Sequence, residues 1–216
     1  MKIRDCKYYL IDLDGVILNT SYDNYFWQEH IPKIYAKKND ISLKDGINFT
    51  HTLFNYKKGS KEWYDVNYWT NILDIDIIDE KKKQENMSLI TIHPGSLDVL
   101  EKLNHLNKEL FLVTNAHRRT LDVKLSKFDL SKYFDELICS HELGYIKEDI
   151  QFWHLLRNKL GIVYEETMLV EDTFENINSA FHSGMSNFIY ISDEDENKRN
   201  ITTRNMSSFS ELASCI

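Results

Sequence analysis

Short apolar runs alternate with segments of helical spacing through most of the chain, and this alternation limits the fold more than any other feature. The runs lie at residues 8–11, 110–113, 137–139, 168–170 and 188–191. Continuous apolar strands separated by amphipathic helices are typical of a parallel sheet that helices cover on both faces. The sequence therefore predicts an α/β fold built on a parallel sheet.

Between these runs, leucine, isoleucine and phenylalanine recur at the spacing of one helix face. The predicted helices lie near residues 97–106, 121–128, 152–160 and 177–181. Gly161 and Gly184 follow the last two, where glycine commonly ends a helix.

Residues 21–92 interrupt the alternation directly after the first strand. This region is rich in aromatic residues at helical spacing and has no convincing strand series. We interpret it as an inserted helical subdomain, so the predicted boundaries are 1–20 and 93–216 for the sheet core and 21–92 for a helical cap. The charged runs at 81–83 and 193–198 are predicted to be solvated surface.

The first apolar run ends in two carboxylates, Asp12 and Asp14, followed at once by Gly15. Residues i and i+2 of a strand point to the same side, and ligands of open α/β sheets bind at the carboxyl ends of the strands. Two close carboxylates repel each other unless a cation or a proton compensates them. The pair predicts a bound Mg²⁺, a carboxylate nucleophile with a neighbouring acid/base, or both.

Polar side chains also follow three later strands. They are Thr114 and Asn115, then Lys147, then Glu171 and Asp172. In a parallel sheet these strand ends share one edge, so together they offer carboxylates, a cation and hydrogen-bond donors. That set suits phosphoryl transfer, which needs an in-line nucleophile, charge neutralisation and donors around the phosphoryl oxygens.

Single residues of this set also have structural explanations. Thr114 and Asn115, like Asp172, could cap a following helix. A lone lysine such as Lys147 is more often solvated surface. The functional interpretation depends on all the strand ends taken together.

Composition limits the partners of the chain. Its 216 residues with 42% apolar content suffice for one sizeable core. The net charge of −8 argues against a nucleic-acid or membrane surface but permits a small phosphorylated metabolite held by a few local cations. Three scattered cysteines, no signal-peptide pattern and no membrane-length apolar stretch favour a cytoplasmic protein with reduced thiols.

Taken in order, these motifs resemble those of a known superfamily. Asp12-x-Asp14-Gly15-Val16, Thr114, Lys147 and Glu171-Asp172 are similar to the four motifs of the haloacid dehalogenase (HAD) superfamily. The resemblance implies a Rossmann-like core with a helical cap inserted after the first strand. It also implies a Mg²⁺-dependent phosphatase that works through an aspartyl-phosphate intermediate.

The resemblance also implies a role for each position. Asp12 would attack phosphorus, and Asp14 would protonate the leaving oxygen and then activate water. Such an acid needs a pKa near the working pH, so its surroundings must raise it. Thr114 and Asn115 would contact the phosphoryl group, while Lys147 would neutralise both nucleophile and phosphate.

For the metal, the resemblance implies oxygen ligands from the same motifs. Asp172 would bind Mg²⁺ directly together with Asp12, Glu171 would bind it directly or through a water, and the backbone carbonyl of Asp14 would also face it. Mg²⁺ prefers such oxygen ligands and keeps several waters.

The predicted cap narrows the resemblance to bacterial GMP/IMP 5′-nucleotidases. The matching segments are 23–27, 63–64, 68–69, 114–117 and 144–149. The chain departs at Asn67 and Glu171, where aspartate is expected. The predicted function is hydrolysis of purine 5′-mononucleotides such as IMP and GMP. Asn24 and Trp27 are predicted as cap residues near the site, although aromatic residues of a helical cap mostly pack its own core.

Two other functions stay open at this point. Asp14 favours phosphate esters, because the dehalogenase branch lacks this second aspartate. A phosphosugar phosphatase or phosphomutase would use the same core. A non-catalytic ligand-binding member is the third possibility, but a pure binder has no need of an acid at Asp14.

Overall fold

The computed structural model describes residues 3–192 and 201–216, and the charged run predicted at 193–198 lies outside them. The chain divides into two compact units. The sheet unit comprises Met1–Asn19, Ile92–Asn115 and Asp129–Ile216, and the helical unit comprises Thr20–Thr91 and Ala116–Phe128. The predicted boundaries assign residues 116–128 to the sheet core, whereas their contacts place them in the helical unit.

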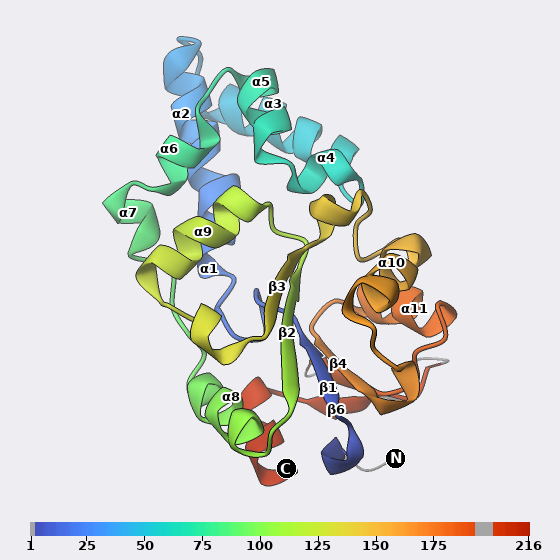
Figure 1. Cartoon of the computed structure of the whole chain (residues 1–216). Helices are drawn as coiled ribbons and strands as arrows, with labels where there is room; N and C mark the ends of the chain where they lie inside the picture. Colours follow the sequence, from blue (N-terminus) through green and yellow to red (C-terminus); the bar gives the residue numbers. More distant parts are fainter. Residues whose placement is uncertain (1–2, 193–200) are drawn as a thin grey trace. The chain divides into compact units, whose positions relative to one another are not determined.

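The sheet unit is built on six parallel strands. They are β1 (Tyr8–Ile11), β2 (Glu109–Thr114), β3 (Glu136–Cys139), β4 (Thr167–Glu171), β5 (Phe188–Ile191) and β6 (Arg204–Met206). Their order across the sheet is β3-β2-β1-β4-β5-β6 (Figure 1). The predicted α/β fold with a Rossmann-like parallel core is confirmed.

The last strand, β6, was not predicted from the sequence. Arg204 and Asn205 are polar and at least partly exposed, and only Met206 is buried. A short strand at the edge of a sheet carries no continuous apolar run, so apolar patterning does not detect it.

The order of the strands places a topological switch point beside β1. Successive strands β1, β2 and β3 extend the sheet to one side, and β4, β5 and β6 extend it to the other. Ile11 therefore pairs with Leu112 of β2 on one side and Val170 of β4 on the other. In open α/β sheets, ligands bind outside the carboxyl ends of the strands at such a point.

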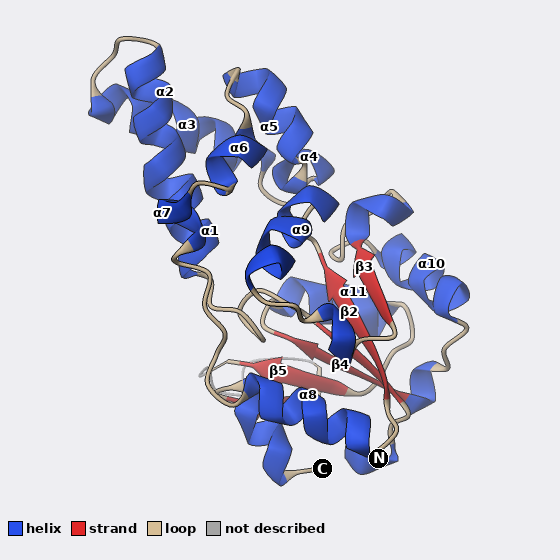
Figure 2. Ribbon diagram, turned by 60° about the vertical axis from the view of Figure 1, so that its left-hand side comes forward, coloured by secondary structure: helices blue, strands red, loops and turns tan. Residues whose placement is uncertain are grey.

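Helices cover both faces of the sheet. Helices α10 (Ile150–Leu160) and α11 (Phe174–His182) pack together on one face, while α8 (Ser96–His105) packs with the 3₁₀ turn Phe209–Ser214 on the other (Figure 2). Gly161 ends α10 with φ of 65°, which confirms the predicted glycine stop. In the described residues, no helix has both the length and the apolarity to cross a membrane.

The helical unit contains eight α-helices in its described residues. They are α1 (Ser21–Tyr25), α2 (Ile31–Lys38), α3 (Leu43–Lys57), α4 (Lys61–Tyr64), α5 (Val66–Leu73), α6 (Ile77–Lys81), α7 (Gln84–Met87) and α9 (Arg118–Lys127). A π-helical segment, Phe26–His30, joins α1 to α2. Helix α9 packs against α6 and α7, which explains why it belongs to this unit.

Aromatic and aliphatic side chains together form the core of the helical unit. Phe54 lies edge-on to Trp69, with ring centres 5.0 Å apart, and Trp27 lies edge-on to Phe54 at 5.3 Å. Edge-to-face pairs of this kind are favoured by the charge distribution of the rings. The aromatic spacing of the sequence thus reports mainly packing, and the partly buried Trp27 packs against that core.

One prediction about this unit was wrong: Lys81 is not solvated. Its side chain is 1% exposed, and its ammonium donates to Asp23 Oδ1 at 2.8 Å. Lys124 from α9, 2% exposed, donates to the other carboxylate oxygen at 2.5 Å. Asp23 compensates two buried cations, and this arrangement ties α1, α6 and α9 together.

Replacing Asp23 by asparagine is expected to lower the free energy of unfolding by about 1–3 kcal/mol, because two buried ammonium groups lose a charged partner. Burial opposes ionisation of Asp23, but Lys124 and Lys81 outweigh it and hold its pKa below the usual range. The ion pairs therefore stabilise the fold above a pH of about 4 and lose this effect as the pH falls further.

Urea denaturation at neutral pH and near pH 3 tests this prediction. The difference in the free energy of unfolding between wild type and Asp23→Asn should be smaller in acid. Asp74→Asn is the matched control, since Asp74 is exposed and pairs with the partly exposed Lys38. That change should cost less than about 1 kcal/mol. Equal stability of wild type and Asp23→Asn at neutral pH would contradict the assignment.

Candidate active site

Three carboxylates gather where β1 and β4 end. Asp12 directly follows β1, Glu171 is the last residue of β4, and Asp172 follows it. One oxygen of each carboxylate lies within 4.8 Å of one from each of the others. Asp12 and Glu171 are buried and Asp172 is half-buried. The structure thus brings together three of the predicted metal-binding side chains at the switch point of the sheet.

Lys147 lies among these carboxylates, and its side chain is also buried. Its ammonium donates to Asp12 Oδ1 at 2.5 Å, to Glu171 Oε2 at 2.6 Å and to the carbonyl of Val113 at 3.0 Å. Three acceptors around one ammonium use all its hydrogens and fix its position. The predicted lysine is therefore part of the site and not a surface residue.

Burial and charge oppose each other in this cluster. Burial raises the pKa of Asp12 and of Glu171 to about 7, and that of Asp172 to about 6, although Lys147 lowers all three. Burial disfavours the charged form of Lys147, but Asp12 and Glu171 outweigh it and raise its pKa above the usual range. When all three carboxylates are ionised, they and the one ammonium leave two negative charges, which one divalent cation would neutralise.

Glu171 uses its second oxygen to hold the start of α11. Its Oε1 accepts hydrogen bonds from the backbone N–H groups of Asp172 at 3.1 Å and Thr173 at 3.0 Å. The N–H groups that precede a helix have no partners within it, so an acceptor here is favourable. Glu171 therefore connects Lys147 to the backbone that carries Asp172.

Gly15 makes room for Asp172. Its φ is 86°, a conformation that residues with a side chain rarely adopt. A Cβ at this position would lie 1.9 Å from Asp172 Oδ2, far inside a van der Waals contact. Glycine after Asp14 is therefore a spatial requirement of the site as well as of the turn.

Changing Gly15 to alanine is expected to displace the Asp172 carboxylate and to lower kcat/KM of phosphate-ester hydrolysis by about 100-fold. Gly161→Ala is the matched control, because Gly161 also has a positive φ but nothing within 4 Å of the added Cβ. It should lose only stability, about 1 kcal/mol, and keep its activity. Equal activities of the two variants would refute the steric role of Gly15.

The remaining predicted site residues of the sheet unit lie at the same strand ends. Thr114 is the last residue of β2 and is buried. Asp14 lies two residues after Asp12, and its charge helps to raise the pKa of Asp12. Asn115 contacts residues 144–149, the loop that carries Lys147 and is called the lysine loop below. Its Oδ1 accepts a hydrogen bond from the backbone N–H of Lys147 at 2.9 Å.

The two predicted cap residues belong to the helical unit. Asn24 donates from its side-chain amide to Thr20 Oγ1 at 3.2 Å. Trp27 is partly buried and packs against the core described above. Their contact with a substrate stays a prediction.

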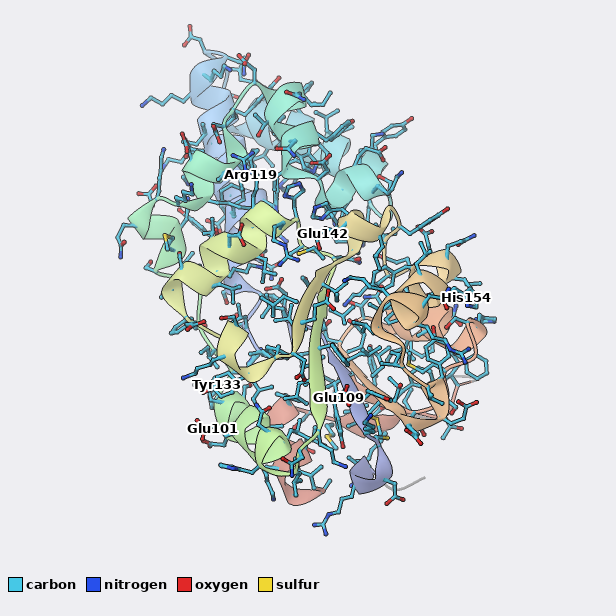
Figure 3. All side chains as sticks on the ribbon, viewed as in Figure 1. Glu101, Glu109, Arg119, Tyr133, Glu142 and His154 are labelled. Atoms are coloured by element: carbon cyan, nitrogen blue, oxygen red, sulfur yellow. The ribbon has the colours of Figure 1, made fainter. Side chains whose placement is uncertain are left out.

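Two side chains that sequence reasoning missed support the lysine loop. Trp153 of α10 donates from Nε1 to the Lys147 carbonyl at 2.8 Å, and Ser179 of α11 donates its hydroxyl to the same carbonyl. Trp153 is fully buried, while the next residue, His154, lies on the outer face of α10 (Figure 3). A single aromatic residue on a helix gives no signal of such a contact in the sequence.

The donor set fits a hard divalent cation. All side-chain ligands that the cluster offers are carboxylate oxygens, which Mg²⁺ prefers over nitrogen or sulfur donors. Asn176, in the first turn of α11 and four residues after Asp172, is buried, and its Oδ1 has no hydrogen-bond partner among the described residues. Such an oxygen could accept a hydrogen bond from a metal-bound water. The cluster could therefore hold a metal ion.

The comparison with known families agrees with this geometry. The family model described as haloacid dehalogenase-like hydrolase matches residues 9–190, which include every side chain of the cluster. The chain belongs to the haloacid dehalogenase-like hydrolases. The resemblance predicted from the four motifs is thereby confirmed.

Several relatives of this hydrolase are phosphatases. It is 28% identical over 192 residues to the GMP/IMP nucleotidase YrfG of Escherichia coli, covering 89% of this chain and 86% of the relative. It is 23% identical over 184 residues to a phosphorylated carbohydrates phosphatase of Thermotoga maritima, covering 82% and 81%. A HAD phosphatase from Thermococcus onnurineus has the same fold, with a TM-score of 0.83, 21% identity and 96% coverage of both chains. Family and relatives together support phosphate-ester hydrolysis.

Proposed function

We propose that this protein is a Mg²⁺-dependent phosphatase that hydrolyses purine 5′-mononucleotides, IMP and GMP, to nucleoside and phosphate. The cluster of Asp12, Glu171 and Asp172 around the Lys147 ammonium carries the proposal. It combines a buried carboxylate that can act as nucleophile, a fixed cation, and two excess negative charges that suit a divalent metal.

The proposed chemistry has two displacement steps at phosphorus. A carboxylate oxygen of Asp12 forms a bond to phosphorus while the bond to the 5′ oxygen breaks, and Asp14 gives that oxygen its proton. Water then attacks the aspartyl phosphate, Asp14 takes the proton of the water, and the bond between Asp12 and phosphorus breaks. Splitting hydrolysis in this way replaces one difficult step with two easier ones.

The other residues of the site would stabilise charge. The Lys147 ammonium, already 2.5 Å from Asp12 Oδ1, would neutralise the phosphoryl oxygens as the nucleophile loses its charge. Thr114, at the end of the adjacent strand β2, would donate its hydroxyl to the same group. Mg²⁺ held by Asp12, Asp172 and Glu171, and by the backbone carbonyl of Asp14, would supply further charge neutralisation.

The purine assignment is supported by the E. coli relative. Its similarity covers 89% of this chain and thus extends through the helical unit as well as the sheet unit. Helical caps of this kind exclude water and contact the leaving group, so they set substrate choice. The family-level motifs alone would not separate one phosphate ester from another.

A panel of phosphate esters tests the proposal. Phosphate release is measured from IMP, GMP, AMP and several sugar phosphates, with Mg²⁺ present and again after chelation. The expected result is the highest kcat/KM for IMP and GMP, and loss of all activity on chelation that added Mg²⁺ restores. Full activity without a divalent cation would overturn the metal assignment.

A sugar phosphate is the second candidate substrate, favoured by the phosphorylated carbohydrates phosphatase of T. maritima. Equal or better turnover of a sugar phosphate than of IMP would replace the nucleotide assignment with this one. Conversion of one sugar phosphate into an isomer without net phosphate release would instead indicate a phosphomutase. No hydrolysis of any ester would leave a ligand-binding protein.

A further inference from the structure

The main chain of Lys147 is held as firmly as its ammonium. Its N–H donates to Asn115 Oδ1 at 2.9 Å, and its carbonyl accepts from Trp153 Nε1 at 2.8 Å and from the hydroxyl of Ser179. The N–H contact comes from the segment after β2, and the two carbonyl contacts come from α10 and α11. Both main-chain polar groups of Lys147 are therefore bound by side chains.

Asn115 makes a second contact that determines which way its amide faces. Its Nδ2 donates to Glu148 Oε2 at 2.8 Å, and the residue is 7% exposed. A carboxylate can only accept hydrogen bonds, so Glu148 requires the NH₂ end of the amide on its side. The carbonyl end is then left for the N–H of Lys147. Glu148 thus selects the orientation of Asn115 that the lysine backbone needs.

From this geometry we infer that Asn115 and Glu148 form a positioning pair for Lys147. The pair acts through the lysine. This differs from the role predicted for Asn115 from the sequence, which was direct contact with the phosphoryl group. The inference rests on the proposed phosphatase chemistry, in which Lys147 neutralises charge. It assigns a role to Glu148, a residue of the matching segment 144–149 for which the sequence predicted none.

The effect of the pair on the rate depends on how small a displacement of the Lys147 ammonium breaks its contacts. Lys147 Nζ lies 2.5 Å from Asp12 and 2.6 Å from Glu171, so a small backbone shift would break one of these contacts. Misplacing a catalytic group by about 1 Å can cost about 100-fold in rate. A loss of this kind should appear in kcat more than in KM, because the chemical step depends on the position of the charge.

Exchanging the two functional groups provides the test. Asn115→Asp keeps the oxygen that accepts from Lys147 but turns a second carboxylate oxygen toward Glu148. With p-nitrophenyl phosphate as substrate, kcat should fall by about 30-fold. Glu148→Gln keeps an acceptor for the Asn115 amide, and its kcat should fall by only about 3-fold.

The double variant Asn115→Asp with Glu148→Gln restores a donor facing an acceptor, now with the amide and the carboxylate exchanged. Independent effects would multiply to about 100-fold, whereas the positioning pair predicts recovery to within about 5-fold of wild type. Glu165→Gln, which neutralises an exposed carboxylate elsewhere in the sheet unit, is the charge control and should behave as wild type. Thermal denaturation of every variant shows whether it is folded.

Two results would overturn the inference. One is wild-type kcat for Asn115→Asp. The other is a double variant no more active than Asn115→Asp, which is expected if Asn115 contacts the phosphoryl group itself. Nitrogen NMR of the Lys147 ammonium, assigned with Lys147→Arg, gives a readout without turnover: its buried, slowly exchanging signal should weaken in Asn115→Asp and return in the double variant. An inactive wild type would refute the proposed function, while this signal would still decide the positioning role.

Discussion

Asp12→Asn is expected to reduce phosphate release by at least about 10⁴-fold, because an amide oxygen cannot form the aspartyl-phosphate bond that the carboxylate forms. The substitution is isosteric, and it removes one of the two carboxylates that accept from the Lys147 ammonium. The variant should therefore fold as well as the wild type. Loss of activity would then report the missing nucleophile and not a damaged structure.

The measurement is single-turnover and steady-state release of phosphate from IMP with Mg²⁺ present. Transfer of labelled phosphate to the wild-type protein, absent from Asp12→Asn, would identify the covalent intermediate directly. Substantial residual turnover by the folded variant would remove Asp12 as the nucleophile and favour direct attack by water.

The second large effect concerns stability. Lys147→Met is expected to lower the free energy of unfolding of the metal-free protein by about 3–5 kcal/mol, because it leaves buried carboxylates without their cation. In this variant, Asp12 and Glu171 both lose the ammonium that lies within 2.6 Å of them. When ionised, neither carboxylate has a hydrogen to donate to the other. Chemical denaturation in the presence of a chelator measures this loss.

Added Mg²⁺ should recover part of the lost stability, since a ligand that binds only the folded state stabilises it by RT ln(1 + [L]/Kd). Lys159→Met is the control, because Lys159 pairs with Glu136 at a site where both side chains are about 40% exposed. That pair should contribute less than about 1 kcal/mol. Unchanged stability of Lys147→Met would mean that water reaches the carboxylates of the cluster more readily than their burial indicates.

Much of the sheet could be predicted, because strands covered on both faces need continuous apolar runs. That requirement marks β1 to β5 in the sequence and fails for β6, which lies at the edge with a polar Arg204. The gathering of the candidate site residues could be predicted for a related reason. Parallel strands bring their ends to one edge, so Asp12, Lys147 and Glu171 are neighbours as soon as the topology is known.

Side-chain pairs between distant segments could not be predicted. Lys81 belongs to a run of three lysines and has the pattern of solvated surface, yet Asp23, 58 residues earlier, binds it in the interior. Glu148 lies in the matching segment 144–149, but nothing in that segment predicts its contact with Asn115, 33 residues earlier. Burial of a charge depends on the partner that the fold supplies, and local sequence does not contain that partner.

The division of the chain has a consequence for protein engineering. Because residues 116–128 belong to the helical unit, the chain passes between the two units four times, not twice as a simple insertion would. Deleting 21–92, or exchanging it for the insertion of another hydrolase, would leave Lys124 of α9 without Asp23. A functional chimera should therefore transfer α9 together with the insertion, as two separate pieces of sequence.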